Sequence, residues 1–138
     1  MSPGKLATQV AHASMAFISN RLLNSPGEYI PKTGLWHAYQ LTVDMELGEW
    51  DYWWNDALTK TVCEAKDRNQ LMEAVTIAEE LGFKENVDFF LIKDACLTDL
   101  KPEEIDENGV GRTLTCIGFR PLDDETAGKI SKKFQLYK

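Results

Sequence analysis

The stretch that decides the fold is Gly4–Ala13, which reads GKLATQVAHA. Ser2 is a good N-cap residue and Pro3 suits the first helical position, so we expect a helix to begin here. Apolar residues recur at helical spacing, which predicts one buried stripe. The stripe consists of Leu6, Val10, Ala13 and Phe17.

A polar row runs beside that stripe. Lys5 falls in the first turn, where the helix macrodipole favours anions over cations. Gln9 and His12 follow it at i+4 and i+7, so the three side chains share one face. A lysine, an amide and an imidazole near exposed backbone N–H groups suit an anionic or ester-bearing ligand. A plain solvated helix face is the alternative.

Downstream, strand-like and helix-like segments alternate. Leu58–Ala65 is rich in β-branched residues and reads as a strand, and Asp67 or Asn69 can cap a helix that Gly82 ends. Val87–Ile92 is a nearly continuous apolar run, typical of a buried parallel strand. Strand, helix and strand in this order predict a right-handed βαβ unit.

The C-terminal third completes an α/β pattern. Arg112–Phe119 predicts another strand, and Asp123 or Asp124 opens a final helix. We therefore expect an α/β fold, a single-domain three-layer α/β/α protein with a small mixed sheet. Asp94 lies just past an expected strand, where such sheets bind ligands. A turn or capping role is the alternative for a lone acid there.

Length and composition limit the class of protein to which the chain can belong. The chain has 138 residues, enough for one domain with a hydrophobic core. No run is apolar enough to cross a membrane, and the start has no secretory signal. Cys63, Cys96 and Cys116 lack Cys-x-x-Cys spacing, so we expect reduced thiols in a cytoplasmic protein, without disulfides or a zinc site.

Charge is unevenly distributed. The net charge of −7 is not typical of an RNA-binding protein. Residues 1–23 nevertheless carry +2, whereas residues 24–56 carry one lysine against six acids, or −5. A local basic patch beside the first helix therefore stays available to an anionic partner.

Three segments carry recognisable motifs in a fixed order. Gly4–Ala13 fits the pattern G-K-x-A-x-Q-x-x-H-A, Asp94–Thr98 (DACLT) fits D-A-G-x-T, and Thr113–Gly118 (TLTCIG) fits T-V-L-x-I-G. The closing residues 126–137 run from TAGK to a hydrophobic end. Together these segments resemble the type-2 peptidyl-tRNA hydrolases over residues 3–23 and 58–138.

The resemblance implies hydrolysis of the ester that joins a peptide to the 3′ ribose of tRNA. Peptidyl-tRNA would be the partner, and neither a metal nor an organic cofactor is implied. Lys5 would stabilise negative charge on the ester oxygen or a nearby phosphate. Asp94 would orient Lys5 or polarise the water, and Thr98 would hydrogen-bond the water or the leaving group. Further substrate-binding candidates are Gln9, His12 and Thr113.

If these residues form one site, Lys5 and Asp94 should lie within about 10 Å of each other. A buried, hydrogen-bonded histidine without chemistry is the alternative for His12. The alternative for the whole chain is a binding or regulatory protein that keeps the fold without the activity. Cys96, in place of the motif glycine, and Leu97, where many members have a polar or basic residue, favour it.

Two further departures affect the expected assembly. The family has a strand before the Gly-Lys helix, whereas we expect the helix here to begin within four residues of Met1. Either the chain was truncated or its start was assigned at an internal methionine, or the sheet is completed in another way. We therefore expect an unpaired sheet edge, which is closed either by self-association, as in a dimer, or by part of residues 24–56.

Residues 24–56 are an aromatic-rich insertion within a domain that we expect to span residues 1–138. Such rings can stack on RNA bases, but the acids among them favour core packing of the insertion or a self-association surface. The aromatic residues are Trp36, Tyr39, Trp50, Tyr52, Trp53 and Trp54.

Overall fold

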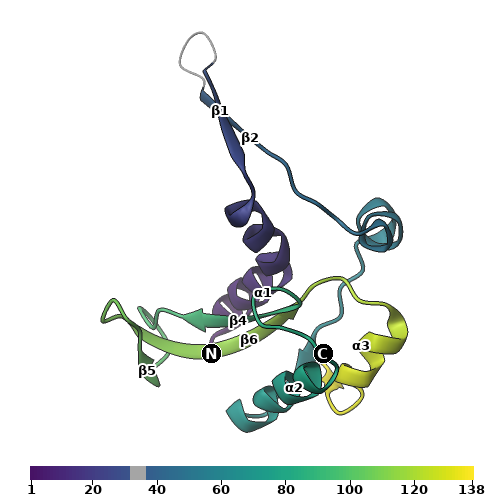
Figure 1. The fold of residues 1–138 in the computed structure, drawn as a ribbon. Coiled ribbons are helices and arrows are strands. Elements are labelled where there is room, and N and C mark those ends of the chain that lie inside the picture. The colour runs from purple at the N-terminus through teal and green to yellow at the C-terminus, as the bar shows by residue number, and fades with distance from the viewer. Residues whose placement is uncertain (32–36) are drawn as a thin grey trace. The chain divides into compact units, whose positions relative to one another are not determined.

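The computed structural model describes residues 1–31 and 37–138 (Figure 1). The chain divides into two compact units, Met1–Phe17 with Thr59–Lys138, and Ile18–Leu58. The elements in chain order are α1 (Pro3–Asn24), β1 (Gly27–Pro31), β2 (His37–Leu41), the π-helix η1 (Glu49–Ala57), β3 (Cys63–Glu64), α2 (Arg68–Glu80), β4 (Phe89–Asp94), β5 (Glu104–Ile105), β6 (Gly111–Phe119), α3 (Asp124–Ser131) and β7 (Gln135–Leu136).

Helix α1 begins where the sequence predicts. The Ser2 hydroxyl accepts a hydrogen bond from the backbone N–H of Lys5 at 3.4 Å, as an N-cap does. Pro3 is the first helical residue. Ala13 and Phe17 of the predicted stripe are buried. The start of the chain is therefore fixed against the rest of the first unit.

Strands β4 and β6 form the centre of the first unit and pair in antiparallel fashion, with β6 lying between β4 and β5. Gly118 of β6 lies against the backbone of Ala13, because no side chain separates α1 from this face. The neighbouring residue in the strand, Phe119, faces the other way and packs against Val75 and Ala78 of α2.

This alternation gives the predicted three layers, with α1 on one face of the sheet and α2 on the other (Figure 1). Phe89 of β4 is fully buried and belongs to the hydrophobic core between the sheet and α2. The α/β class is thus confirmed, and the sheet places one end of α1 beside the end of β4.

The pairing of the strands differs from expectation. The predicted parallel βαβ unit is wrong, because β4 pairs antiparallel with β6 and β3 pairs antiparallel with β7. An antiparallel sheet covered by helices on both faces gives the same continuous apolar run as a parallel one. The ladders of the described residues are antiparallel, so the expected mixed sheet is also wrong; one isolated parallel bridge joins Glu85 and Phe89.

Of the strand expected at Leu58–Ala65, only Cys63–Glu64 forms a strand, β3. Residues 58–62 are exposed and belong to none of the strand ladders in the described part of the chain. Alternating β-branched residues form a strand only where a neighbour accepts their backbone hydrogen bonds.

The remaining predicted elements form. Asp67 caps α2 by accepting from the N–H of Gln70, and Gly82 follows the helix with φ +84°. Asp123 caps α3 by accepting from the N–H of Thr126. The run predicted at Val87–Ile92 forms β4 two residues later, so Asp94 is the last residue of that strand.

The second unit contains the insertion. Strands β1 and β2 pair with each other in a sheet of their own. Of the two alternatives for the unpaired sheet edge, closure by part of residues 24–56 is therefore wrong for the described residues. Arg21 of α1 and buried Glu49 of η1 form a two-pronged ion pair, with N–O distances of 2.6 and 2.9 Å.

The aromatic residues of η1 do not form a core for the insertion. Trp50, Tyr52 and Trp54 are 47%, 82% and 40% exposed, so core packing is wrong for them. Trp53 and Trp54 contact each other with ring centres 5.7 Å apart. Trp36 lies outside the described residues. Within residues 1–31 and 37–138, no helix has the length and apolar character needed to cross a membrane.

Candidate functional site

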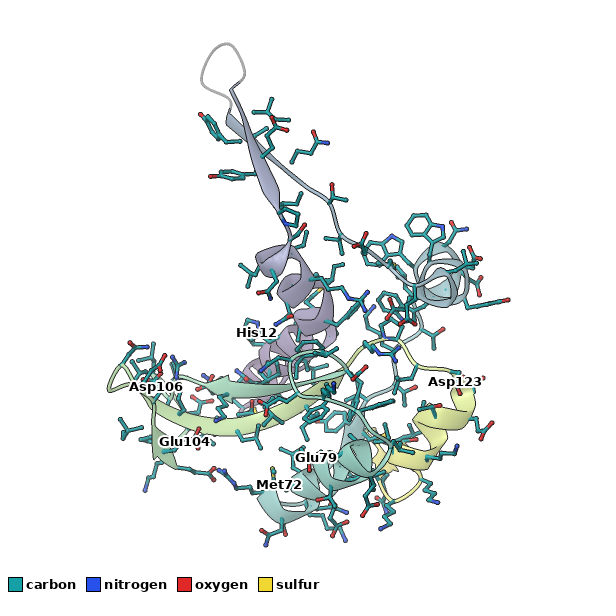
Figure 2. The ribbon with its side chains drawn as sticks, in the orientation of Figure 1. His12, Met72, Glu79, Glu104, Asp106 and Asp123 are labelled. Carbon is teal, nitrogen blue, oxygen red and sulfur yellow. The ribbon has the colours of Figure 1, made fainter. Side chains whose placement is uncertain are left out.

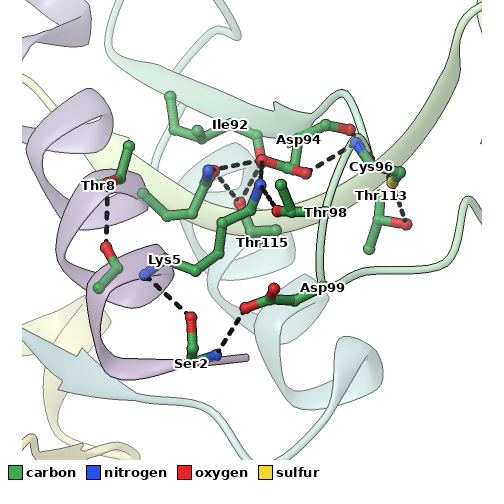
Figure 3. A network of polar contacts seen from close by, with 12 residues as sticks. Ser2, Lys5, Thr8, Ile92, Asp94, Cys96, Thr98, Asp99, Thr113 and Thr115 are labelled. Atoms are coloured by element: carbon green, nitrogen blue, oxygen red, sulfur yellow. Dashed lines mark hydrogen bonds and ion pairs between the residues drawn. The ribbon is translucent and has the colours of Figure 1, made fainter.

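The first turn of α1 carries a lysine to the end of β4 (Figure 3). Lys5 Nζ lies 2.7 Å from Asp94 Oδ2 and 3.2 Å from Thr98 Oγ1. The Lys5 and Asp94 side chains are only 16% and 9% exposed. The expected convergence of these three residues is therefore present, well inside the 10 Å limit.

Asp94 is surrounded by donors. The backbone N–H of Cys96 donates to Oδ1 at 2.8 Å, and Gln9 Nε2 donates to Oδ2 at 2.8 Å beside Lys5. The hydrogen bond from Lys5 is the main cause that holds the pKa of Asp94 below its ordinary value, while burial opposes it and the Cys96 and Gln9 bonds add to it. Asp94 is therefore a fixed carboxylate at neutral pH.

Gln9 links this carboxylate to β6. Its side chain is 3% exposed. Its amide nitrogen donates to Asp94, and its oxygen accepts from Thr115 Oγ1 at 2.7 Å. Both ends of the amide thus have partners, as buried polar groups require.

The turn after β4 keeps its shape without a glycine. Cys96 adopts φ +54°, a left-handed conformation that costs a non-glycine residue about 1 to 2 kcal/mol. Its backbone N–H still reaches Asp94, and its Sγ lies 3.3 Å from Thr113 Oγ1. A cysteine in place of the motif glycine is therefore compatible with a left-handed residue in this turn.

Thr113 and His12 lie differently from the central three residues. Thr113 is buried, and its hydroxyl donates to the carbonyl of Lys101 at 2.5 Å. His12 is exposed on α1 (Figure 2), so the alternative of a buried histidine is wrong. Leu97 is 85% exposed beside the site. The structure therefore brings together Lys5, Gln9, Asp94 and Thr98, with Thr113 behind the turn and His12 outside the hydrogen-bonded group.

A further contact fixes the start of α1 over this turn. The backbone N–H of Ser2 donates to Asp99 Oδ2 at 3.3 Å. The hydrogen bond to Ser2 is the main cause that holds the pKa of Asp99 below its ordinary value. The contact joins the residue before α1 to the residue after Thr98, so it holds the first turn of α1, which carries Lys5, next to Thr98.

The arrangement suits charge stabilisation. An ammonium group fixed between a carboxylate and a hydroxyl can stabilise negative charge that develops on a nearby oxygen. In the described part of the chain, no three His, Cys, Asp or Glu side chains are grouped so as to hold a metal ion.

Comparison with known proteins agrees with this geometry. A sequence model of the family described as peptidyl-tRNA hydrolase PTH2 matches residues 1–137. The chain belongs to the PTH2 family. A peptidyl-tRNA hydrolase of Thermococcus sibiricus is 30% identical over 137 residues, which cover 99% of this chain and 86% of that protein.

Two other archaeal relatives show the same extent of similarity. The peptidyl-tRNA hydrolase of Methanopyrus kandleri is 29% identical over 132 residues, covering 95% of this chain and 83% of the relative. That of Sulfurisphaera tokodaii is 29% identical over 137 residues, covering 99% and 88%. The PTH2 similarity therefore includes the insertion as well as the motif-bearing unit.

Sequence reasoning missed one polar residue of this PTH2 site. Thr115 lies in β6 between two apolar or weakly polar neighbours, Leu114 and Cys116. A hydroxyl inside such a strand needs a partner if it is buried. That need was the available signal, but it did not identify Gln9 as the partner, since the two residues lie 106 positions apart.

Proposed function

We propose that this chain hydrolyses the ester bond of peptidyl-tRNA and releases peptide and tRNA. The observation that carries the proposal is the contact of Lys5 with both Asp94 and Thr98, made by two PTH2 motifs that are distant in sequence. The relatives named peptidyl-tRNA hydrolase cover nearly the whole chain, which supports the same activity here.

In the proposed mechanism, Lys5 stabilises the negative charge that develops on the ester oxygen as water attacks. Asp94 orients Lys5. A role as the base that takes the proton from water is less well supported, because both of its oxygens already accept hydrogen bonds. Thr98 can hydrogen-bond the attacking water or the leaving ribose oxygen, since its hydroxyl lies beside the ammonium group.

Three residues are proposed to position the substrate. Gln9 does so indirectly, through Asp94. His12 is exposed on α1 and is proposed to contact the tRNA, whose phosphates attract basic and polar groups. Thr113 is proposed to act through the Asp94–Thr98 turn, because its hydroxyl contacts Cys96 and the carbonyl of Lys101.

The experiment is release of an N-acetylated amino acid from N-acetylaminoacyl-tRNA by the purified chain. We expect multiple turnovers, and we expect Thr98→Val, which removes only the hydroxyl, to lower the rate at least about tenfold. Thr98→Ser retains the hydroxyl and serves as the matched control. An inactive binding protein would instead bind the tRNA and leave the ester to hydrolyse at the rate of buffer.

We further propose that the chain acts in the cytoplasm as a homodimer, and that residues 1–138 work as one domain bearing the insertion. The three cysteines are free thiols, which supports a reducing compartment. Outside Gly111 and Arg112, which pair with β5, the edge of β6 that faces away from β4 has no strand partner in the described residues. Such an edge supports pairing with a second copy.

A further inference from the structure

Thr115 occupies an irregular position in the sheet. Ile92 of β4 pairs with Cys116, but the next residue, Lys93, pairs with Leu114. Thr115 is therefore the extra residue of a β-bulge, an irregularity that redirects a side chain. The bulge brings its hydroxyl within 2.7 Å of Gln9 Oε1 and 3.0 Å of the carbonyl oxygen of Ile92.

The hydroxyl holds the far end of the Gln9 amide in place. The Asp94 carboxylate only accepts hydrogen bonds, so Gln9 must present its NH₂ group to it. The amide oxygen then needs a donor, and the Thr115 hydroxyl has one proton to give. Its oxygen lies closer to Gln9 Oε1, at 2.7 Å, than to the Ile92 carbonyl oxygen, at 3.0 Å, so Gln9 is the nearer acceptor. Without that donor, the buried amide oxygen would lose its partner, and the Gln9 side chain would no longer be held in place beside Asp94.

A displaced amide would disturb the contact of Asp94 with Lys5. Gln9 Nε2 and Lys5 Nζ both bind the same carboxylate oxygen, Oδ2, at 2.8 and 2.7 Å. Displacement of the amide would remove the Gln9 hydrogen bond that holds Oδ2 in place, so the carboxylate could turn away from the ammonium group. The charge on Lys5 would then lose its fixed direction.

We propose that Thr115 is a positioning residue for peptidyl-tRNA hydrolysis, which acts by fixing the Gln9 amide that holds Asp94 against Lys5. The proposal rests on the proposed function. Thr115 stands where the motif T-V-L-x-I-G has leucine, so this contact comes from the chain's own sequence.

The test combines a matched pair of variants with a double-mutant cycle. Thr115→Val removes the hydroxyl and keeps the shape. We expect kcat to fall about tenfold while KM changes less than about twofold, because the hydroxyl contacts Gln9 and the Ile92 carbonyl inside the chain. Thr115→Ser keeps the hydroxyl and should retain kcat. Thr76→Val in α2 removes a threonine hydroxyl far from the site and should leave kcat unchanged.

The cycle asks whether Thr115 acts through Gln9. In a Gln9→Leu background, adding Thr115→Val should lower kcat less than about twofold further. An equal loss in both backgrounds, an equal loss in Thr115→Ser, or an unchanged kcat in folded Thr115→Val would overturn the proposal. Thr115→Ala replaces the valine variant if that one does not fold.

A measurement without substrate separates this proposal from the proposed function. The side-chain NH₂ resonances of Gln9, assigned by their absence in Gln9→Leu, should shift in Thr115→Val and stay in place in Thr115→Ser. If the wild-type chain releases no amino acid but these shifts occur, the proposed function fails while the orienting contact stands. Unshifted resonances would refute the contact itself.

Discussion

At the scale of single residues, the protonation state of Asp94 links the stability of the site to its chemistry. Its carboxylate accepts from Lys5, the backbone of Cys96 and Gln9. Each of these bonds favours the charged form, and the pKa in the folded chain lies below the ordinary value of 3.8. Protonation of Asp94 therefore costs more in the folded chain than in the unfolded one.

This shift predicts how stability depends on pH. Because the folded pKa is lowered, the stabilisation by the Asp94 carboxylate is fully present above pH 3.8 and is lost as the pH falls through the folded pKa. Asp94→Asn should reduce the free energy of unfolding by about 1 to 3 kcal/mol at pH 6, and by progressively less below pH 3.8.

Urea unfolding between pH 2.5 and 6 measures this difference. Asp51→Asn, at an exposed position of η1, is the matched control and should show no comparable loss at pH 6. A deficit for Asp94→Asn that stays constant, or grows, as the pH falls would contradict the account.

The sequence predicted that Lys5 and Asp94 lie close together, but it did not predict the Gln9–Thr115 contact beside them. The first-turn position of Lys5 and the strand-end position of Asp94 are visible as patterns along the chain. The contact of Gln9 with Thr115 depends on a bulge whose position follows from the pairing of β4 with β6. Strand register is a property of two segments together, so neither segment alone could show it.

At the scale of elements, the site depends on how closely α1 approaches β6. Gly118 has no side chain, and a Cβ added there would overlap the backbone of Ala13. Gly118→Ala should therefore move α1 off the sheet and lower the free energy of unfolding by about 2 to 3 kcal/mol. Lys5 and Gln9 lie in α1 and would move with it, so the rate of hydrolysis should fall at least about tenfold.

Gly128→Ala is the matched control. This glycine lies inside α3, and nothing lies within 4 Å of an added Cβ. The alanine should raise the free energy of unfolding by about 0.5 to 1 kcal/mol and leave hydrolysis unchanged. Thermal unfolding and the hydrolysis assay check both variants. A stable, fully active Gly118→Ala would show that the close approach does not position the site.

Helices were predicted more accurately than strand pairing. Ser2, Asp67 and Asp123 mark their helices because a cap is a local contact between residues three or four apart. The direction of pairing between β4 and β6 is not local, and the apolar run of β4 fits parallel and antiparallel sheets alike. The exposed η1 aromatics likewise differ from the buried arrangement that ring composition favours.

At the scale of the whole molecule, the net charge of −7 weakens the long-range electrostatic attraction of an anionic substrate. The net negative charge is largest in residues 24–56, which carry −5, whereas residues 1–23 carry +2. Attraction over a long range is therefore weak, and binding of tRNA depends on short-range contacts near α1.

The open edge of β6 predicts assembly. Backbone N–H and C=O groups along residues 113–119 have no strand partner on the side away from β4 in the described residues, and exposed edges pair with other chains. Sedimentation equilibrium at micromolar concentration should give twice the mass of 15.7 kDa. A mass of one chain at every concentration tested would refute the dimer without affecting the argument for hydrolysis.

The most direct test of the central claim is the single-turnover rate of ester hydrolysis by Lys5→Ala, measured with enzyme in excess over N-acetylaminoacyl-tRNA. The account predicts a rate at least about 100-fold below wild type, because the positive charge next to the developing oxyanion is lost. Lys66→Ala, at an exposed lysine outside the site, should retain the wild-type rate. Hydrolysis by folded Lys5→Ala at the wild-type rate would contradict the account.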